Sequence, residues 1–310
     1  MKVSAYVMAD GSTSPSDAFT EQAALEALTG ACQQVGISPE GAELIRIGSN
    51  AVFRLGEVIA RVAPSADLLA NAEKQITVAR WLDSIDYPAM RALDVPQPVE
   101  AAGRVVTFWH SVAAETKFAP IADVATLIRR LHSITSVPPE LVLPEIEPFG
   151  PPGSPLPEFP GLPVADAQFL QERISWARDT FRTLPYVLPR GVIHGDANVG
   201  NVLLDEERRP VLVDLDSFAV GPREWDLIQT ALFYDRLGWH TEAEYRTFVD
   251  VYSFDLMTWS GYEDLADIRE VAMTTWLSKK AGTSRDALRE ASKRIKVMKS
   301  GRDCRRWSPF

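Results

Sequence analysis

The hydrophobic positions in the first third of the chain repeat with two different spacings. Over residues 19–35 and 64–83, apolar side chains recur every three or four positions, which predicts two amphipathic helices. Between and after these helices lie β-branched, apolar runs bounded by turn residues, which predicts strands. The predicted strands are residues 42–48, 51–56, 58–64 and 105–112. This part of the chain is therefore expected to form a small sheet that carries helices.

The remaining two thirds of the chain show mostly the helical spacing. The apolar positions predict helices over residues 123–134, 165–184, 223–238, 241–254, 262–282 and 284–300. Residues 137–163 are rich in proline, which interrupts helices and central strands, so no regular element is expected there. Because this segment interrupts the helical part rather than separating two lobes, we interpret it as a surface insertion and not as a linker.

The predicted elements divide the chain into two lobes. A polar stretch with many small residues makes residues 1–18 a loose leader, and the lobe up to residue 110 is built on the sheet. Residues 111–310 form a larger, mostly helical C-terminal lobe that includes the proline-rich insertion. The predicted fold class is therefore α+β with two lobes.

The composition favours a folded protein that binds a small molecule. The 310 residues are 46% hydrophobic and 24% charged, and their net charge of −10 disfavours contacts with nucleic-acid phosphates. Only Cys32 and Cys304 are present, so no disulfide framework is expected. No apolar run is long enough to span a membrane, and the first residues lack the apolar core of a signal peptide. We expect a cytoplasmic protein that binds neither nucleic acid nor membranes.

The most informative stretch is residues 192–216, where acidic and amide side chains surround a predicted hairpin. If Leu204 pairs with Val211, Asn201 lies opposite Asp214. Side chains on directly opposite residues of paired strands lie close enough to share one cation. An amide oxygen and a carboxylate suit Mg²⁺, which takes few protein ligands and leaves its other positions to water and phosphates. Asp196 precedes the hairpin on a loop, where its carboxylate is free to act on a substrate.

The His-Gly-Asp sequence that ends at Asp196, followed by Asn201 and Asp214, resembles the Brenner-type motifs of the aminoglycoside phosphotransferase and choline-kinase-like family, which has the protein-kinase fold. Further segments similar to that family are residues 78–84, 127–134 and 221–227. The resemblance implies that Asp196 orients the acceptor hydroxyl and accepts its proton, and that Asn201 and Asp214 bind Mg²⁺. The alternative is that Asp196 and Asn201 are ordinary turn residues.

Other polar residues near this motif are expected to support it. His194 is expected to hold the loop rather than take part in chemistry, and His132 to be structural. Asp216 is either a further metal or loop ligand or a hydrogen-bonded turn residue, and we favour the turn. Asp226 is expected to accept backbone donors from the loop, as a nearby acid of the family does; the alternative is a solvent-facing helix acid.

The nucleotide side of the expected cleft is formed by the first strands. The turn at Ser49 and Asn50 is the candidate phosphate loop, although it lacks a glycine-rich pattern. Arg61 occupies the strand position where the family usually has lysine, and the two residues bind phosphates differently. Glu73 on the following helix is the expected partner of Arg61. The alternatives are an exposed strand arginine and a solvated helix acid.

The strand at residues 105–112 resembles the hinge strand between the lobes of such kinases, whose backbone would meet the nucleotide base. This resemblance implies that Phe108, Trp109 and His110 belong to the nucleotide site. The alternatives are that the two aromatic side chains are part of the core and that His110 is structural.

Charge is unevenly distributed in the C-terminal lobe. Residues 223–270 contain eleven acids against four arginines and many aromatic side chains, whereas residues 271–310 contain eleven basic residues against three acids. Acids beside aromatic rings suit a cationic, hydroxylated acceptor. The predicted acceptor-binding residues are Trp225, Asp226, Tyr234 and Asp235. Alternatively, the aromatic residues are core, and the acids are solvated and pair with the basic tail.

Together these features predict a phosphotransferase of the protein-kinase-like fold. It would use ATP or GTP with Mg²⁺ to phosphorylate a hydroxyl of a small, cationic acceptor, such as an aminoglycoside-like compound or an amino sugar, as a monomer or homodimer. One alternative is a nucleotide-binding pseudokinase, suggested by Arg61. Another is a metal-dependent phosphoesterase that uses the same His, Asp and Asn side chains.

Overall fold

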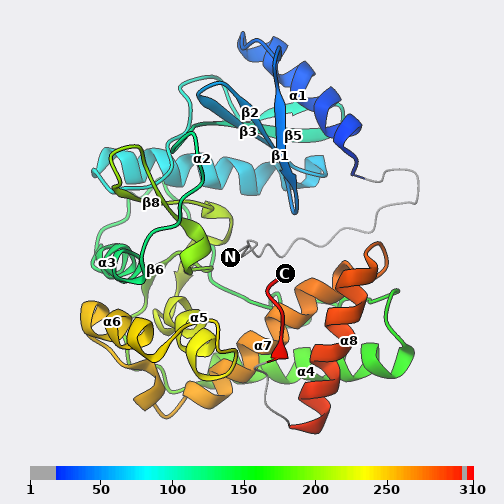
Figure 1. Cartoon of the computed structure of the whole chain (residues 1–310), viewed down its shortest axis with the longest axis vertical. Helices are drawn as coiled ribbons and strands as arrows, with labels where there is room; N and C mark the ends of the chain where they lie inside the picture. Colours follow the sequence, from blue (N-terminus) through cyan, green and yellow to red (C-terminus); the bar gives the residue numbers. More distant parts are fainter. Residues whose placement is uncertain (1–18, 302–305) are drawn as a thin grey trace.

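The computed structural model of the chain describes residues 19–301 and 306–310, which form two lobes stacked one above the other (Figure 1). The leader predicted for residues 1–18 lies outside the described residues, as does Cys304. Within the described part, no helix is long and apolar enough to cross a membrane. One lobe is a sheet with helices and the other is mostly helical, which confirms the predicted fold class.

The sheet of the N-terminal lobe is antiparallel, with the strand order β1-β2-β3-β5-β4. Its strands are β1 (Glu43–Ile47), β2 (Ala51–Leu55), β3 (Val58–Val62), β4 (Val99–Ala101) and β5 (Arg104–His110). Successive side chains of a strand point to opposite faces. Ala60 and Phe108 therefore pack beneath α1 (Glu21–Val35), whereas Arg61 and Thr107 face α2 (Leu69–Ser84).

Local sequence signals explain where the first helix begins and ends. The hydroxyl of Thr20 accepts a hydrogen bond from the Ala23 backbone N–H, which caps the N-terminus of α1. At the other end Gly36 has φ of 75°, a left-handed conformation that glycine adopts without steric cost. The helix therefore occupies the predicted segment and covers one face of the sheet.

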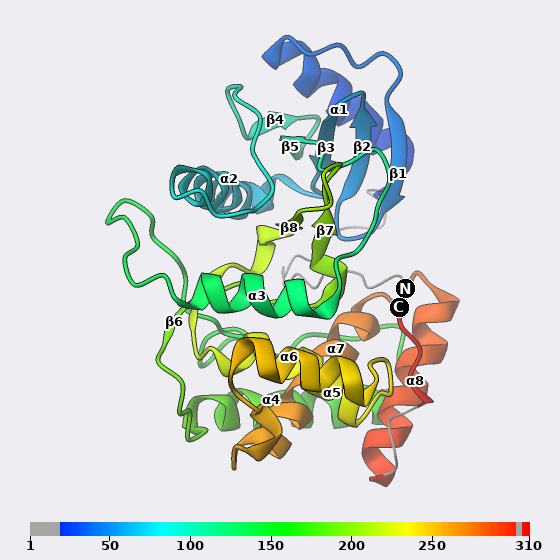
Figure 2. The same ribbon diagram turned by 60° about the vertical axis from the view of Figure 1, so that its left-hand side comes forward.

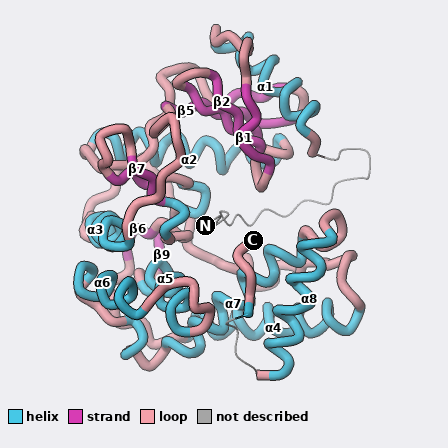
Figure 3. Tube along the Cα trace, viewed as in Figure 1, coloured by secondary structure: helices cyan, strands magenta, loops and turns pink. Residues whose placement is uncertain are grey.

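The C-terminal lobe is a bundle of helices that pack in pairs (Figures 2 and 3). These helices are α3 (Ile121–His132), α4 (Val164–Thr183), α5 (Glu224–Asp235), α6 (Glu242–Tyr252), α7 (Tyr262–Lys279) and α8 (Arg285–Ser300). α7 contacts α4, α5 and α8, so it lies at the centre of the lobe. As predicted, residues 137–163 form no helix or strand.

Two small antiparallel ladders, only the second of which is a hairpin, lie where the lobes meet (Figures 2 and 3). β6 (Gly191–Ile193) pairs with β9 (Ala219–Gly221), and β7 (Val202–Leu204) pairs with β8 (Pro210–Leu212). In the second ladder Leu204 pairs with Pro210, not with Val211, so the predicted register was wrong by one residue. Pro210 can begin the strand because the first strand residue is a position where proline is tolerated.

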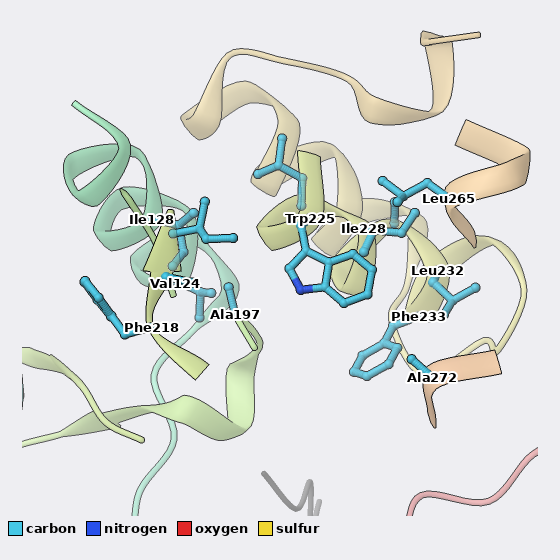
Figure 4. Packing of buried hydrophobic residues seen from close by; sticks show 14 of the residues in the cluster. Val124, Ile128, Ala197, Phe218, Trp225, Ile228, Leu232, Phe233, Leu265 and Ala272 are labelled. Carbon is cyan, nitrogen blue, oxygen red and sulfur yellow. The ribbon is translucent and has the colours of Figure 1, made fainter. Parts of the chain in front are cut away.

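The larger hydrophobic core supports the region between the ladders and the helices. Trp225 and Ile228 of α5 pack near Leu265 of α7, as Figure 4 shows. The same cluster includes Ala197 and Phe218, which flank the two ladders. The core therefore extends directly beneath the loop that carries the candidate residues.

Candidate active site

Asp196 lies on the loop between β6 and the short helix η2 (Val199–Asn201), and its side chain is buried. Its Oδ1 accepts a hydrogen bond from Nη2 of Arg269 at 2.5 Å, and its Oδ2 accepts one from Nδ2 of Asn201 at 3.0 Å. Burial raises the pKa of Asp196, and the nearby Arg269 guanidinium opposes this increase. The structure thus joins Asp196 and Asn201 and adds Arg269, which the sequence did not predict.

Asp226 on α5 anchors this loop from below. Its carboxylate accepts backbone N–H groups of His194 and Gly195, both at 2.7 Å, and Nε2–H of His132 at 3.0 Å. Burial alone would raise the pKa of Asp226, but these hydrogen bonds outweigh it and lower the pKa. The expected acceptance of backbone donors agrees with these contacts. Its prediction as an acceptor-binding residue was wrong, because the carboxylate is buried and engaged.

His194 and Gly195 fix the shape of the loop. The Asp196 backbone N–H donates to Nδ1 of His194, so the ring carries its proton on Nε2 and donates to the Val213 carbonyl at 3.0 Å. Gly195 has φ of 83°, and a Cβ there would lie 2.2 Å from the Ser217 carbonyl oxygen. Only glycine fits this close approach of two chain segments. His194 therefore holds the loop, as expected.

Asp214 and Asp216 form a carboxylate pair beside this loop. Nη2 of Arg61 donates to Oδ1 of Asp214 at 3.3 Å and to Oδ1 of Asp216 at 3.0 Å. Burial raises the pKa of Asp216 to about 7, and the neighbouring Asp214 adds to this increase. The preference for Asp216 as a turn residue was wrong, because its side chain lies in the site.

The predicted partner of Arg61 was also wrong. Nη1 of Arg61 donates to Oε1 of Gln75 on α2 at 3.3 Å, whereas Glu73 is exposed on another face of that helix. Lys74 extends to the neighbouring η3 segment (Leu215–Ser217) and donates to the carbonyl oxygens of Asp216 and Phe218 at 2.6 and 3.2 Å. The contacts from α2 to Arg61 and to the carboxylate pair thus come from Gln75 and Lys74.

The oxygen ligands around the carboxylate pair suit a divalent cation bound to phosphates. Asp214 and Asp216 both pair with the single positive charge of Arg61. The amide nitrogen of Asn201 donates a hydrogen bond to the carboxylate of Asp196. Among residues 19–301 and 306–310, no cluster of three or more His, Cys, Asp or Glu side chains could hold a metal. The small number of carboxylates at the site is compatible with Mg²⁺, which usually takes one or two carboxylates and completes its coordination with water and phosphate oxygens.

The candidate phosphate loop lies next to this pair. Ser49 and Asn50 line a small hollow together with Arg61, Asp214 and Asp216. Four of these five residues were predicted for nucleotide or metal binding, and they come from β3, a turn of the N-terminal lobe and the junction of the lobes. The fifth residue, Asp216, was only a weaker candidate in the sequence.

The predicted base-binding strand contributes less than expected. Phe108 is buried beneath α1, on the face opposite Arg61, and its backbone N–H donates to Gln97 Oε1, so its side chain cannot meet a nucleotide in the interlobe cleft. Trp109 is buried in the larger core, on the Arg61 face of β5. His110 is exposed, and its backbone N–H donates to the Arg91 carbonyl. Phe108 and Trp109 are therefore core residues, which was the alternative to their prediction as nucleotide-binding residues.

Two of the predicted acceptor-binding residues are engaged by other residues of the C-terminal lobe. Tyr234 stacks on Tyr245, with ring centroids 5.1 Å apart, and Asp235 accepts the hydroxyl of Tyr262 at 2.8 Å. Trp225 is buried, and its Nε1–H donates to the Gly195 carbonyl at 3.0 Å. Trp225 therefore supports the loop, and the acidic, aromatic stretch of the sequence does not form one surface.

Two hollows adjoin Arg269, and the first of them is also lined by Asp196. The first, called the aromatic hollow here, is lined by Asp196, Gln229, Phe233, Trp239, Arg269 and Trp276, with Met273, Arg294, Pro309 and Phe310. The second is a groove of about 750 Å³ between α2, residues 142–157 and α7, called the proline groove. Arg269 lines both, and in the sequence nothing distinguishes this arginine from those of a solvated helix face.

Comparison with known proteins agrees with this fold. The model of the phosphotransferase enzyme family matches residues 43–266, which is more than half of the chain, whereas no curated protein matches the sequence. Solved structures that are similar include an amicoumacin kinase in complex with AMP-PNP, Ca²⁺ and Ami (TM-score 0.64, 13% identity, 87% of this chain and 91% of that chain). A microcompartment-associated aminopropanol kinase has a TM-score of 0.64 at 15% identity, with 91% and 99% of the chains covered. A choline/ethanolamine kinase family protein from Mesorhizobium loti has a TM-score of 0.56 at 17% identity, with 88% and 94% covered.

At these identities the similar structures show a shared fold, and the family match extends from β1 to α7. It includes the Asp196 loop, the carboxylate pair and Arg61. The chain therefore belongs to the phosphotransferase enzyme family.

Proposed function

We propose that the protein transfers the γ-phosphoryl group of a Mg²⁺-bound nucleoside triphosphate, ATP or GTP, to a hydroxyl group of a small molecule. The observation that carries this proposal is the convergence of Asp196, Asn201 and Asp214 at the junction of the lobes, with Arg61 beside them. The acceptor oxygen would bond to the γ-phosphorus while the bond to the leaving β-phosphate oxygen breaks. Asp196 would orient the hydroxyl and accept its proton.

In this proposal Asn201, Asp214 and Asp216 hold Mg²⁺, and Arg61 with the Ser49 turn binds the phosphates. The bound Mg²⁺ supplies charge neutralisation for the phosphate oxygens. The burial of Asp196 supports its role, because a buried carboxylate with a raised pKa is a better proton acceptor than an exposed one. Asp226 would be a positioning residue, since it acts through the loop backbone.

The acceptor is less constrained than the reaction. The nitrogen-bearing acceptors in the names of similar structures, such as aminopropanol and choline, support the cationic acceptor predicted from the sequence, because each carries an amine or a quaternary ammonium group. The acids on which that prediction depended are used within the protein: Asp226 by the loop backbone and Asp235 by Tyr262. We therefore retain a hydroxylated small molecule as the acceptor.

A screen of ADP release across hydroxyl compounds tests this function. We expect Mg²⁺-dependent ADP release that rises with a suitable acceptor and falls by a factor on the order of 10² in Asp196→Asn. Binding of nucleotide without any turnover would favour the pseudokinase. Release of phosphate from esters in the absence of nucleotide would favour the phosphoesterase.

A further inference from the structure

The backbone that carries the two carboxylates of the site depends on contacts with the rest of the protein. Residues 214–218 are called the carboxylate segment here. Asp214 has φ of 66° and ψ of 72°, a left-handed conformation that is less favourable for aspartate than for glycine. The chain then makes the single turn of η3, which is closed by a hydrogen bond from the Phe218 N–H to the Leu215 carbonyl at 3.3 Å. Because one turn is not stable in isolation, surrounding groups must fix where the carboxylates lie.

Lys74 of α2 supplies two of these contacts, both to main-chain oxygens. Its Nζ lies 2.6 Å from the carbonyl oxygen of Asp216 and 3.2 Å from that of Phe218. Burial lowers the pKa of Lys74 to about 8, so the ammonium form predominates at neutral pH. Hydrogen bonds from a charged donor are stronger than those between neutral groups. One ammonium group therefore fixes the course of the chain over the last three residues of the carboxylate segment.

The carboxylate oxygens themselves are held by a different residue. Arg61 donates to Oδ1 of Asp214 and to Oδ1 of Asp216. A Mg²⁺ ion at these carboxylates would compete with Arg61 for the same oxygens. The two contacts of Lys74 use main-chain oxygens instead, so they can persist when a metal binds to the carboxylates.

The Lys74 contacts also connect elements on both sides of the lobe junction. α2 belongs to the N-terminal lobe and contacts η3. The chain after η3 continues into β9, which pairs with β6, the strand that precedes the Asp196 loop (Figure 2). A change in the position of α2 would therefore act on the carboxylate segment through Lys74.

We propose that Lys74 is a positioning residue: it fastens the carboxylate segment to α2 and so makes the Mg²⁺ site depend on the position of this helix. The inference rests on the proposed function, in which Asp214 and Asp216 hold the Mg²⁺ that accompanies the nucleotide. Without Lys74 the carboxylates remain, but part of the favourable free energy of Mg²⁺ binding is offset by the entropy lost when the segment is ordered.

The factor by which Mg²⁺ strengthens nucleotide binding, called the Mg²⁺ enhancement here, provides the test. The affinity of the full chain for a non-hydrolysable ATP analogue is measured by calorimetry with saturating Mg²⁺ and again with EDTA. Lys74→Met keeps an apolar side chain without a donor, and it should lower the Mg²⁺ enhancement by roughly tenfold, the order expected for the loss of a hydrogen bond to a charged group. Lys74→Arg keeps the charge and the donors, and it should retain at least about a third of the enhancement.

Two further variants support this comparison. Arg80→Met removes the same charge from an exposed position on α2, and it should leave the Mg²⁺ enhancement within about twofold of wild type. Lys74→Gln keeps a shorter, uncharged donor, and it should lower the enhancement by about threefold or more. It takes the place of Lys74→Met if that variant does not fold.

The outcomes separate a positioning role from other roles of Lys74. A Mg²⁺ enhancement that is unchanged in Lys74→Met or Lys74→Gln overturns the inference. The same conclusion follows if nucleotide affinity falls equally with Mg²⁺ and with EDTA, because a merely structural or phosphate-binding lysine would have that effect. A loss of enhancement in Arg80→Met as large as that in Lys74→Met also overturns the inference.

Asp214→Ala, measured in the same way, distinguishes this inference from the proposed function. If the Mg²⁺ enhancement depends on Asp214 but not on Lys74, the inference fails and the proposed function stands. If the wild type shows no Mg²⁺ enhancement, the proposed use of a Mg²⁺-bound nucleotide fails, and the inference fails with it.

Discussion

Replacing Asp226 with asparagine should destabilise the protein more than its single-atom change suggests. The carboxylate accepts three buried hydrogen bonds, from the backbone of His194 and Gly195 and from the His132 ring. The amide has only one oxygen, so its NH₂ group would face a backbone N–H. One hydrogen bond is then lost, and the buried donor that it leaves unsatisfied costs about 1–3 kcal/mol. The remaining hydrogen bonds become weaker because their acceptor is no longer charged. We expect a total loss of about 2–4 kcal/mol in the free energy of unfolding.

The pH dependence of this loss gives a second signature. The folded-state pKa of Asp226 is lowered, so its charge contributes stability above the ordinary aspartate pKa of about 4. That contribution disappears as the pH falls through the folded-state pKa. The gap in stability between the wild type and Asp226→Asn should therefore be full at pH 7 and narrow progressively below about pH 4.

Urea unfolding followed by tryptophan fluorescence at several pH values measures both effects. Asp235→Asn is the matched control on the same helix, since Asp235 is partly exposed and accepts the hydroxyl of Tyr262. It should cost less than about 1 kcal/mol. The reasoning would be refuted by a loss in Asp226→Asn no larger than that of the control, or by a gap that does not change with pH.

Three further predictions concern the nucleotide side. Asp214→Ala should weaken Mg²⁺-dependent binding of a non-hydrolysable nucleotide by roughly a hundredfold or more, and Asn201→Ala should weaken it less, because an amide contributes only a dipole. Equal nucleotide affinities of the wild type and Asp214→Ala in calorimetry would exclude Asp214 from the metal site. Arg61→Ala and Gln75→Ala should both lower kcat, and the double variant should be little worse than Arg61→Ala alone because the residues are in contact; additive losses would contradict that contact. Glu73→Ala should leave kcat within about twofold of wild type, since Glu73 is exposed, and a large loss would return it to the site.

Helical periodicity predicted most of the C-terminal lobe, because amphipathic helices repeat their apolar positions regularly. Even the correct partner of Arg61 was visible in this way. Ala72, Ile76 and Ala79 form the buried face of α2, and Gln75 lies on that face whereas Glu73 does not. The prediction of Glu73 followed the charge expected from the family instead of the spacing of the helix, and the spacing was the better guide.

Contacts between distant segments were beyond the sequence pattern. Arg269 is 73 residues from Asp196, and it lies in a helix that is buried on most of its surface, where periodicity selects no face. The register of the β7–β8 hairpin depended on whether Pro210 belongs to the loop or to the strand, which gives a connection of six or five residues, and both lengths are compatible with the polar sequence. Such choices are decided by tertiary packing, which local patterns do not report.

The single-turnover rate at which bound [γ-³²P]ATP loses its labelled phosphate, to water or to an acceptor, tests the central proposal most directly. Wild type and Asp196→Asn are compared with Mg²⁺ at nucleotide concentrations that saturate both proteins. The account predicts similar nucleotide affinity and a rate of γ-phosphate loss that is lower in Asp196→Asn by a factor on the order of 10². Equal rates in the two proteins would contradict the assignment of Asp196 as the proton acceptor in phosphoryl transfer.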